Sequence, residues 1–221
     1  RVLGSAGGPR HALPLVDGDT VLIVNGDTLC DMPIRALWDV HLRSGALVTL
    51  GLMRHPQPGR YGGVVLDAPV AAQGEGVLAA GAIAGFVPRT SPVPSVHFPG
   101  IQLVQREVLA PLPDDTPSES VLEVYPRLMA SHPGTVRGAV FDAHFDDVGT
   151  VDDYRRTCLR LAGDAHGNVI DATAVLSASA TIRNTIVWPG AHVPDDCLLE
   201  NAIVTGRTRL APGTHVIGEI C

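Results

Sequence analysis

The chain has 221 residues, 45% of them apolar, which is enough for one well-packed core and a smaller appended unit. A formal net charge of −7 argues against nucleic acid or an anionic membrane surface as a partner. No apolar run reaches the length of a membrane span, and no signal peptide is visible. The four cysteines lack metal or disulfide spacing, which suits a reducing cytoplasm.

The first strong pattern is a strand at residues 21–24, four aliphatics that run into Asn25-Gly26-Asp27. Such a run, bounded by turn residues, predicts a strand buried on both faces of a parallel sheet. The Asp27 carboxylate would then lie at the carboxyl end of the strand, where open α/β sheets bind ligands. Gly26 lacks a side chain, so a ligand can lie close to the backbone there. The alternative is that Gly26-Asp27 is only a turn.

Strand-like and helix-like stretches alternate from residue 14 to about residue 162, as in an α/β layer fold. A helix is expected from Asp31, its cap, to Ser44, with Gly45 ending it. Further expected elements are strands at 46–53, 64–67, 101–104 and 138–143, a hairpin-forming region at 77–87, and helices at 118–130 and 150–161. The last helix begins with Thr150-Val-Asp-Asp, which resembles a capping box.

From residue 163 the sequence changes to a six-residue repeat, after a linker at 163–168. An aliphatic residue or threonine recurs with a small residue four positions later, and the repeat slips by one residue near Cys197. The recurring residues before the slip are Val169, Val175, Thr181, Val187 and Val193. This period predicts a parallel β-helix of about three coils.

A second acidic cluster, Asp146-Asp147, follows the strand at 138–143 and precedes the helix at 150–161. Two carboxylates at neighbouring strand ends could hold one Mg²⁺, which prefers one or two carboxylates plus phosphate oxygens. That arrangement suits phosphoryl or nucleotidyl transfer. Asp147 is favoured over Asp146 because Gly149-Thr150 follows it, and a surface or capping role is the alternative for both.

Several short motifs occur in a specific order along the whole chain. They are Leu3-Gly-Ser-Ala-Gly-Gly8, Val24-Asn-Gly-Asp27, Tyr61-Gly-Gly-Val64, Gly85-Phe-Val87, Gly100-Ile101, Pro126-Arg-Leu128, Asp147-Val-Gly-Thr150 and the hexapeptide tail. In this order the chain resembles the sugar-phosphate nucleotidyltransferases (NDP-sugar pyrophosphorylases), in particular the mannose-1-phosphate guanylyltransferase-like branch. The resemblance implies an α/β fold with a Rossmann-like, mostly parallel sheet over residues 1–162. A short left-handed parallel β-helix over residues 163–221 would follow.

The resemblance also implies roles for individual residues. Asp27 and Asp147 match the metal-binding aspartates, and the loop made by Gly4, Ser5, Ala6, Gly7 and Gly8 matches the nucleotide-binding loop. Gly62 and Gly100, together with Gly26, are expected at the sugar. Arg89 stands where the family has the lysine of a Glu-Lys pair, and Pro88 replaces the glutamate. Phe98-Pro99-Gly100 stands for the family's Asn-Ala-Gly.

The implied reaction is transfer of a nucleoside monophosphate from an NTP to a sugar-1-phosphate with Mg²⁺, and GTP with mannose-1-phosphate is the first pair to consider. Arg89 could bind the sugar phosphate bidentately. The alternatives are a non-catalytic paralogue that binds an NDP-sugar and regulates a partner, and an acyltransferase working through the repeats. The repeats are also expected to mediate homo-oligomer formation. Because the chain begins with Arg1 and the family's glycine-rich triphosphate loop is not matched, we expect a fragment that is inactive by itself.

Overall fold

The computed structural model describes residues 1–70 and 76–221. Its contacts form two compact units, Arg1–Phe145 and Asp146–Cys221. The contacts therefore group the helix at residues 151–162 with the repeats, whereas the expected domain boundary lies after residue 162. Each unit is described by itself below.

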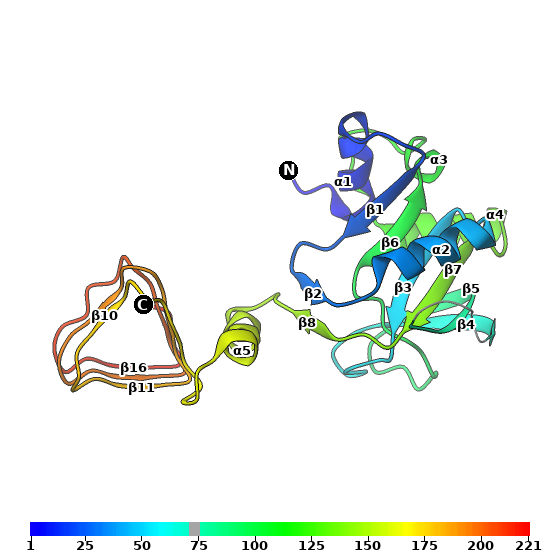
Figure 1. Ribbon diagram of the computed structural model, residues 1–221. Helices are drawn as coiled ribbons and strands as arrows, with labels where there is room; N and C mark the ends of the chain where they lie inside the picture. Colours follow the sequence, from blue (N-terminus) through cyan, green and yellow to red (C-terminus); the bar gives the residue numbers. More distant parts are fainter. Residues whose placement is uncertain (71–75) are drawn as a thin grey trace. The chain divides into compact units, whose positions relative to one another are not determined.

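The first unit is built on a six-stranded sheet. In spatial order its strands are β1 (Thr20–Val24), β6 (Ile101–Gln105), β3 (Val48–Met53), β7 (Val136–Phe141), β5 (Val77–Val87) and β4 (Gly63–Val70) (Figure 1). Within the described residues, β3 and β7 form the parallel pair and the other four neighbouring pairs are antiparallel. The sheet is therefore mixed, and the expectation of a mostly parallel sheet is wrong. The segment 77–87 is one long strand that forms a hairpin with β4.

Strand β1 lies at an edge of this sheet in the described part of the chain, where it pairs with β6 from Thr20–Gln105 to Val24–Ile101. The prediction of a strand buried on both faces is therefore wrong. Val21 is buried, but Leu22 is 44% exposed and Val24 is 49% exposed. The short strand β2 (Thr28–Cys30) follows β1 after a turn.

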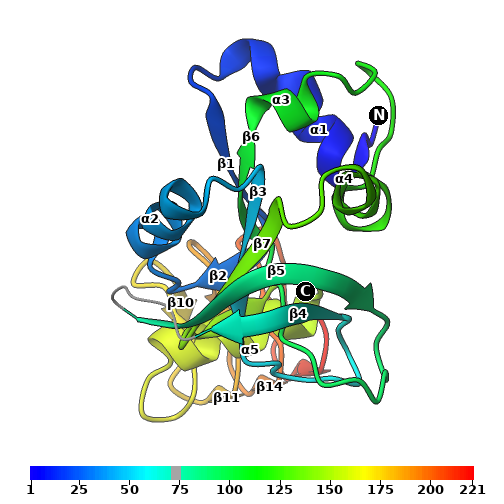
Figure 2. The ribbon, with the colours of Figure 1, turned by 90° about the vertical axis from the view of Figure 1, so that its right-hand side faces the viewer.

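Helices cover both faces of the sheet (Figure 2). On one face, α2 (Ile34–Ser44) packs its buried residues Ala36, Leu37 and Val40 against a cluster that includes Leu103 and Phe141. The other face carries α1 (Gly4–Ala12), η1 (Leu13–Leu15), α3 (Arg106–Leu109), the π-helical turn η2 (Ser120–Val124) and α4 (Tyr125–Ser131). Because both faces are covered, every residue of β3 is buried.

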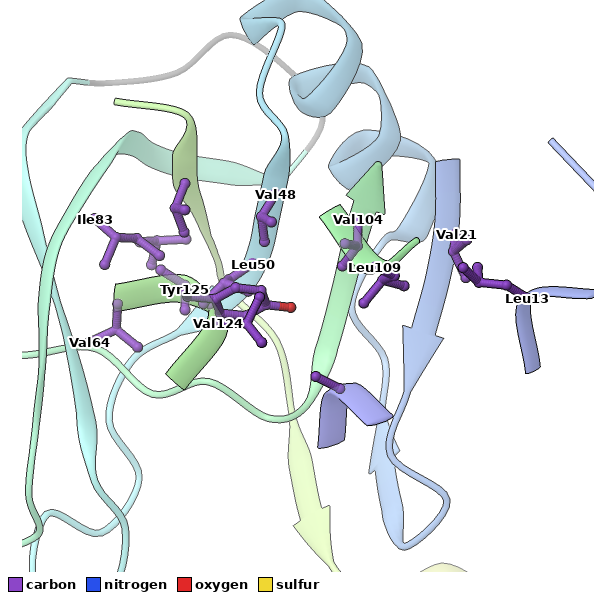
Figure 3. Packing of buried hydrophobic residues seen from close by; sticks show 14 residues of the cluster. Leu13, Val21, Val48, Leu50, Val64, Ile83, Val104, Leu109, Val124 and Tyr125 are labelled. Atoms are coloured by element: carbon purple, nitrogen blue, oxygen red, sulfur yellow. The ribbon is translucent and has the colours of Figure 1, made fainter. Parts of the chain in front are cut away.

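The larger core cluster lies between the sheet and the helices of this second face (Figure 3). Alternate residues of β3, Val48, Leu50 and Leu52, point into it, as the two-residue period of a strand requires. Tyr125 is buried beside them, and its hydroxyl donates a hydrogen bond to Gln102 Oε1 at 2.5 Å. The phenol thus gains a partner for its one polar group, which offsets the cost of burying it.

Two predicted helix ends in this unit can be compared with the structure. Gly45 ends α2 with a φ of +59°, as predicted, because glycine adopts the left-handed region without a steric penalty. The predicted cap Asp31 is wrong: Pro33 is the N-cap residue. The Asp31 carboxylate instead accepts a hydrogen bond from the backbone N–H of His144 at 2.6 Å.

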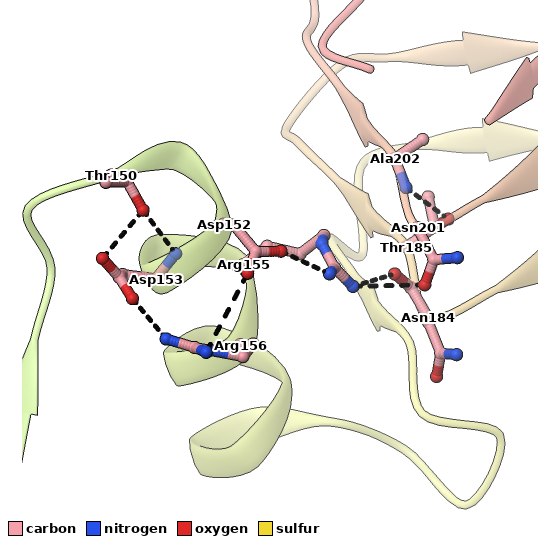
Figure 4. Close-up of polar contacts among 9 residues, drawn as sticks. All are labelled: Thr150, Asp152, Asp153, Arg155, Arg156, Asn184, Thr185, Asn201 and Ala202. Carbon is pink, nitrogen blue, oxygen red and sulfur yellow. Dashed lines mark hydrogen bonds and ion pairs between the residues drawn. The ribbon is translucent and has the colours of Figure 1, made fainter. Parts of the chain in front are cut away.

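The second unit begins with the end of β8 (Phe145–Asp147) and with α5 (Val151–Ala162). The predicted capping motif of α5 is confirmed: Thr150 Oγ1 accepts a hydrogen bond from the Asp153 N–H at 3.1 Å and donates one to the Asp153 carboxylate at 2.7 Å (Figure 4). Arg155 joins this helix to the repeats, since it donates to the Asn184 carbonyl at 3.4 Å and to Asn201 Oδ1 at 3.3 Å.

The repeats form three short parallel sheets, drawn as the sides of a triangular coil in Figure 1. Their strands are β9 (Val169–Ile170), β10 (Val175–Leu176), β11 (Thr181–Arg183), β12 (Ile186–Val187), β13 (His192–Val193), β14 (Leu198–Glu200), β15 (Ile203–Val204) and β16 (His215–Ile217). Val169 pairs with Ile186, and Ile186 pairs with Ile203, so paired residues lie 17 positions apart. The period expected from three six-residue sides was 18.

The difference arises because one side of each coil has a five-residue step. The inward aliphatic residues are Leu176, Ile182, Val187, Val193, Leu199, Val204, Leu210 and Val216. The expected inward positions Val175 and Thr181 are therefore wrong by one residue, and both are exposed. Val187 and Val193 are buried as expected.

Candidate active site

The loop after β1 is held against the segment before β6. The backbone N–H of Asn25 donates to the Gly100 carbonyl at 3.1 Å. Gly100 has a φ of +88°, and a side chain there would overlap the Asn25 amide, so only glycine fits. Nothing lies within 4 Å of the position that a Gly26 side chain would take, and Asp27 is exposed in the turn that follows. The loop thus presents an accessible carboxylate beside open space.

A pocket of about 530 Å³ lies in the same unit, between the ends of β4 and β5 and the turn η2. Its walls include Tyr61 and Gly62 before β4, the segment 86–88 at the end of β5, His97-Phe98, and Val121-Leu122 of η2. Phe98 connects this pocket to the loop at Asn25, because Gly100 follows it by two residues. The pocket has the size of an ordinary small-molecule site.

Gly62 allows the two edges of this pocket to approach closely. A side chain at Gly62 would lie 3.0 Å from the Val87 carbonyl oxygen and 4.0 Å from the backbone nitrogen of Arg89. The backbone at Gly62 thus lies close to the backbone nitrogen of Arg89, and the substrate-binding roles expected for these two residues stay predictions. Arg89 itself is exposed just beyond the carboxyl end of β5.

Four aromatic rings form a cluster beside the pocket, and sequence reasoning missed it. The His97 ring lies 4.8 Å from the Tyr61 ring, 5.4 Å from the His55 ring and 4.9 Å from the Phe145 ring. His55 Nε2 donates a hydrogen bond to the Gly62 carbonyl at 3.2 Å. The two histidines are 42 positions apart and share no ligand spacing, so only their placement on adjacent chain segments could have revealed the cluster.

The segment Gly4–Gly8 was expected to be a loop, and the structure corrects this: it is the beginning of helix α1. The backbone N–H groups of Ala6 and Gly7 donate to the Ser118 carbonyl at 2.9 and 3.1 Å. Ser5 donates to the Glu119 carboxylate from its hydroxyl at 2.7 Å and from its backbone nitrogen at 3.3 Å. These donors therefore already have protein partners.

The glycines of this segment permit that docking. A side chain at Gly4 would lie 2.6 Å from the Ser118 carbonyl oxygen, and one at Gly7 would lie 2.5 Å from the Thr116 carbonyl oxygen. Gly8, in contrast, has nothing within 4 Å of that position. Close approach of two backbones, in addition to any ligand contact, accounts for Gly4 and Gly7.

The second acidic cluster lies in the second unit. Asp146 forms an ion pair with Arg160, and Asp147 Oδ1 accepts a hydrogen bond from the Gly149 N–H at 3.2 Å. Among the residues that the structure describes, no three His, Cys, Asp or Glu side chains form a metal cluster. The Asp147 carboxylate is a hard oxygen ligand of the kind that Mg²⁺ prefers, and the predicted second ligand, Asp27, belongs to the first unit.

The comparisons with known proteins decide the family. Residues 3–162, well over half of the chain, match the family described as "Nucleotidyl transferase". The chain belongs to the nucleotidyl transferase family. The resemblance to sugar-phosphate nucleotidyltransferases is thereby confirmed. Within residues 1–70 and 76–221, the family member has no helix long and apolar enough to span a membrane.

The curated relatives of this nucleotidyl transferase include two mannose-1-phosphate guanylyltransferases. The protein of that name from Mycobacterium tuberculosis is 28% identical over 99% of this chain and 56% of its own length. A probable mannose-1-phosphate guanylyltransferase 3 from Oryza sativa is 26% identical over 99% of this chain and 61% of its own. The chain thus spans little more than half of the length of these relatives.

Among solved structures, HddC from Yersinia pseudotuberculosis complexed with GMP-PN is similar, with a TM-score of 0.57 and 18% sequence identity. The similarity covers 72% of this chain and 63% of that one. A second crystal structure of HddC from Yersinia pseudotuberculosis matches equally well, with the same TM-score of 0.57. These two structures support the fold.

Proposed function

We propose that this chain contributes to the transfer of a nucleoside monophosphate from an NTP to a sugar-1-phosphate, which yields an NDP-sugar and pyrophosphate. The observation that carries the proposal is the pocket beside Gly62, joined through residues 98–100 to the Asp27 loop, in a chain of the nucleotidyl transferase family. GTP and mannose-1-phosphate are the first pair to test, because the relatives carry that name.

In this proposal a phosphate oxygen of the sugar-1-phosphate attacks the α-phosphorus of the NTP, and pyrophosphate leaves. Arg89, exposed beside Gly62, binds the sugar phosphate and holds the attacking oxygen in place. Gly26, Gly62 and Gly100 let the substrate lie against the backbone. The start of α1, from Gly4 to Gly8, lies at the base and ribose.

The family resemblance assigns Asp27 of the first unit and Asp147 of the second as the residues that would hold Mg²⁺, and their carboxylates are of the kind that this ion prefers. When bound, the metal neutralises the charge that develops on the phosphates. Asp146 forms an ion pair with Arg160, and Asp147 is the one of the two that matches the family motif.

The experiment is nucleotidyl transfer by the protein that the complete gene encodes, with Asp27→Asn as the variant. We expect kcat to fall by about 10²–10³, the cost of removing one group that stabilises transition-state charge. Asp17→Asn, at another exposed aspartate of the same unit, is the control and should retain activity. Wild-type activity in Asp27→Asn, with an unchanged unfolding midpoint, would contradict the assignment.

A second candidate function is a regulatory paralogue that binds an NDP-sugar without turnover. The observation that favours it is Pro88, which lines the pocket where a glutamate was expected from the family. Saturable NDP-sugar binding by the complete protein, without pyrophosphate release from any tested NTP, would support this candidate over the enzyme.

The repeat unit is proposed to be a short left-handed β-helix over residues 163–221, separate from a nucleotidyltransferase domain over residues 1–162, in a cytoplasmic protein. Self-association is proposed to occur through its last coil, where Ile217 and Ile220 are exposed. The unpaired edge of a coil is a ready partner for a second copy.

A further inference from the structure

The pocket beside Gly62 is lined mostly by apolar side chains. These are Val64, Phe86, Val87, Pro88, Phe98, Val121 and Leu122. Among the lining residues that the structure describes, none is Asp, Glu, Asn, Gln or Arg, and the polar side chains are those of Tyr61 and His97. Those two rings lie 4.8 Å apart. The two rings are tilted by 44° relative to each other and pack together at one end of the pocket.

One backbone acceptor of the pocket is already partly used. The Gly62 carbonyl, at the rim of the pocket, already accepts a hydrogen bond from His55 Nε2 at 3.2 Å. A carbonyl oxygen has two lone pairs, so this group keeps one acceptor position for a substrate hydroxyl.

One wall of the pocket comes from the π-helical turn η2, which presents Val121 and Leu122. Leu122 is 78% exposed, so its side chain is accessible to a ligand in the pocket. A bound ligand with an apolar face would bury it. Single π-helical turns occur often at functional sites, which agrees with a role for this wall in binding.

We propose that the pocket selects a sugar-1-phosphate with a deoxygenated face, that is, a deoxy or methyl-bearing sugar in place of a fully hydroxylated hexose. The inference rests on the proposed function of the same site. A hydroxyl that is buried against Phe98 and Leu122 loses its water without gaining a partner, whereas a C–H or methyl group gains apolar contact there. A difference of about tenfold to a hundredfold in affinity per buried hydroxyl is the expected size of this effect.

The test compares mannose-1-phosphate with its 2-, 3-, 4- and 6-deoxy analogues by titration calorimetry on the complete protein, and by kcat/KM with GTP. At least one deoxy analogue should bind about tenfold more tightly than mannose-1-phosphate. Equal or tighter binding of mannose-1-phosphate than of every analogue would overturn the inference, and so would the absence of binding by all five.

Variants assign the preference to the pocket wall. Phe98→Asn should reduce the ratio of the affinity for the preferred deoxy analogue to the affinity for mannose-1-phosphate about tenfold. Leu122→Gln, at an exposed position that should not disturb folding, provides a second, independent reading. Leu42→Gln replaces a leucine that is 59% exposed on α2, away from the pocket, and should leave the ratio unchanged. An unchanged ratio in both pocket variants would contradict the inference.

The binding and turnover readouts separate this inference from the proposed function. Preferential binding of a deoxy analogue without turnover would contradict the enzyme function and leave the pocket preference intact. Turnover with a preference for mannose-1-phosphate would contradict only the pocket preference.

Discussion

The two units of this chain use opposite strategies to specify their strand partners. In the first unit, β1 pairs with a strand about 80 positions away and β3 with one about 90 positions away. In the second unit, paired strands lie a constant 17 positions apart. Long-range pairing brings distant loops together into one pocket, whereas a constant step stacks equivalent residues on one another. The candidate substrate pocket accordingly belongs to the unit with long-range pairing.

The comparison predicts that core damage stays within its own unit. Leu50→Ala in β3 and Leu199→Ala in β14 both truncate leucines with 0% exposure, and each should cost about 2–5 kcal/mol. Hydrogen exchange should show faster opening in residues 1–145 for the first variant and in residues 146–221 for the second. Leu42→Ala, at an exposed position, should change neither. Equal loss of protection in both units after either substitution would show that they unfold as one.

Two glycines, one in each unit, have a positive φ but differ in what surrounds them. Gly100 in the first unit has a φ of +88° and is packed against Asn25, whereas Gly213 in the second has a φ of +75° and open space around it. Gly213→Ala should cost about 1 kcal/mol in the free energy of unfolding, from the backbone alone. Gly100→Ala should cost about 1–3 kcal/mol more, because its new methyl group meets the Asn25 amide. Urea denaturation measures both, and equal losses would remove the steric argument.

The smallest expected effect is a pH dependence confined to the first unit. Burial lowers the pKa of His41 below its ordinary value of 6.5. Gln105 Nε2 donates to His41 Nε2 at 2.9 Å, so His41 is neutral and donates from Nδ1 to Thr49 at 2.8 Å. The proton that would charge the His41 ring binds more readily in the unfolded chain than in the folded one. The stabilisation from neutral, buried His41 is therefore fully present above pH 6.5 and is lost as the pH falls toward the folded-state pKa.

The measurement is the urea midpoint between pH 7.5 and pH 5, for wild type and for His41→Gln. The urea midpoint of His41→Gln should be lower than that of wild type at pH 7.5. It should then fall less steeply than the wild-type midpoint as the pH drops to 5. His132→Gln, at an exposed histidine, is the control and should follow the wild-type curve. A steeper decline in His41→Gln than in wild type would contradict the assignment.

Features that depend on nearby residues could be predicted from the sequence. The Gly45 helix end and the Thr150–Asp153 cap were correct because each is decided within four positions. The strands at 48–53 and 101–105 were also found at about the right place. The order of the short motifs along the chain was sufficient to indicate the family. That order can be read without knowing which strands pair with one another.

Features that depend on distant residues could not be predicted. The aliphatic run at 21–24 looks the same in a central and in an edge strand, and nothing local reveals that β6 lies between β1 and β3. The contact between the His55 and His97 rings also depends on how distant segments pair, which no local pattern reveals. Asp31 failed as a cap because the His144 backbone, 113 positions away, uses its carboxylate. The five-residue steps of the coil were hidden because adjacent residues such as Val175 and Leu176 are both aliphatic.

The segment 118–124 contacts both proposed substrate positions, the nucleotide position at the start of α1 and the sugar-phosphate pocket. Its first residues, Ser118 and Glu119, accept hydrogen bonds from the start of α1, and its later residues, Val121 and Leu122, form a wall of the pocket. Seven residues are too few to absorb a shift at one end without moving the other. A base that displaced the start of α1 would therefore alter the pocket wall, so the affinity for one substrate would depend on whether the other is bound.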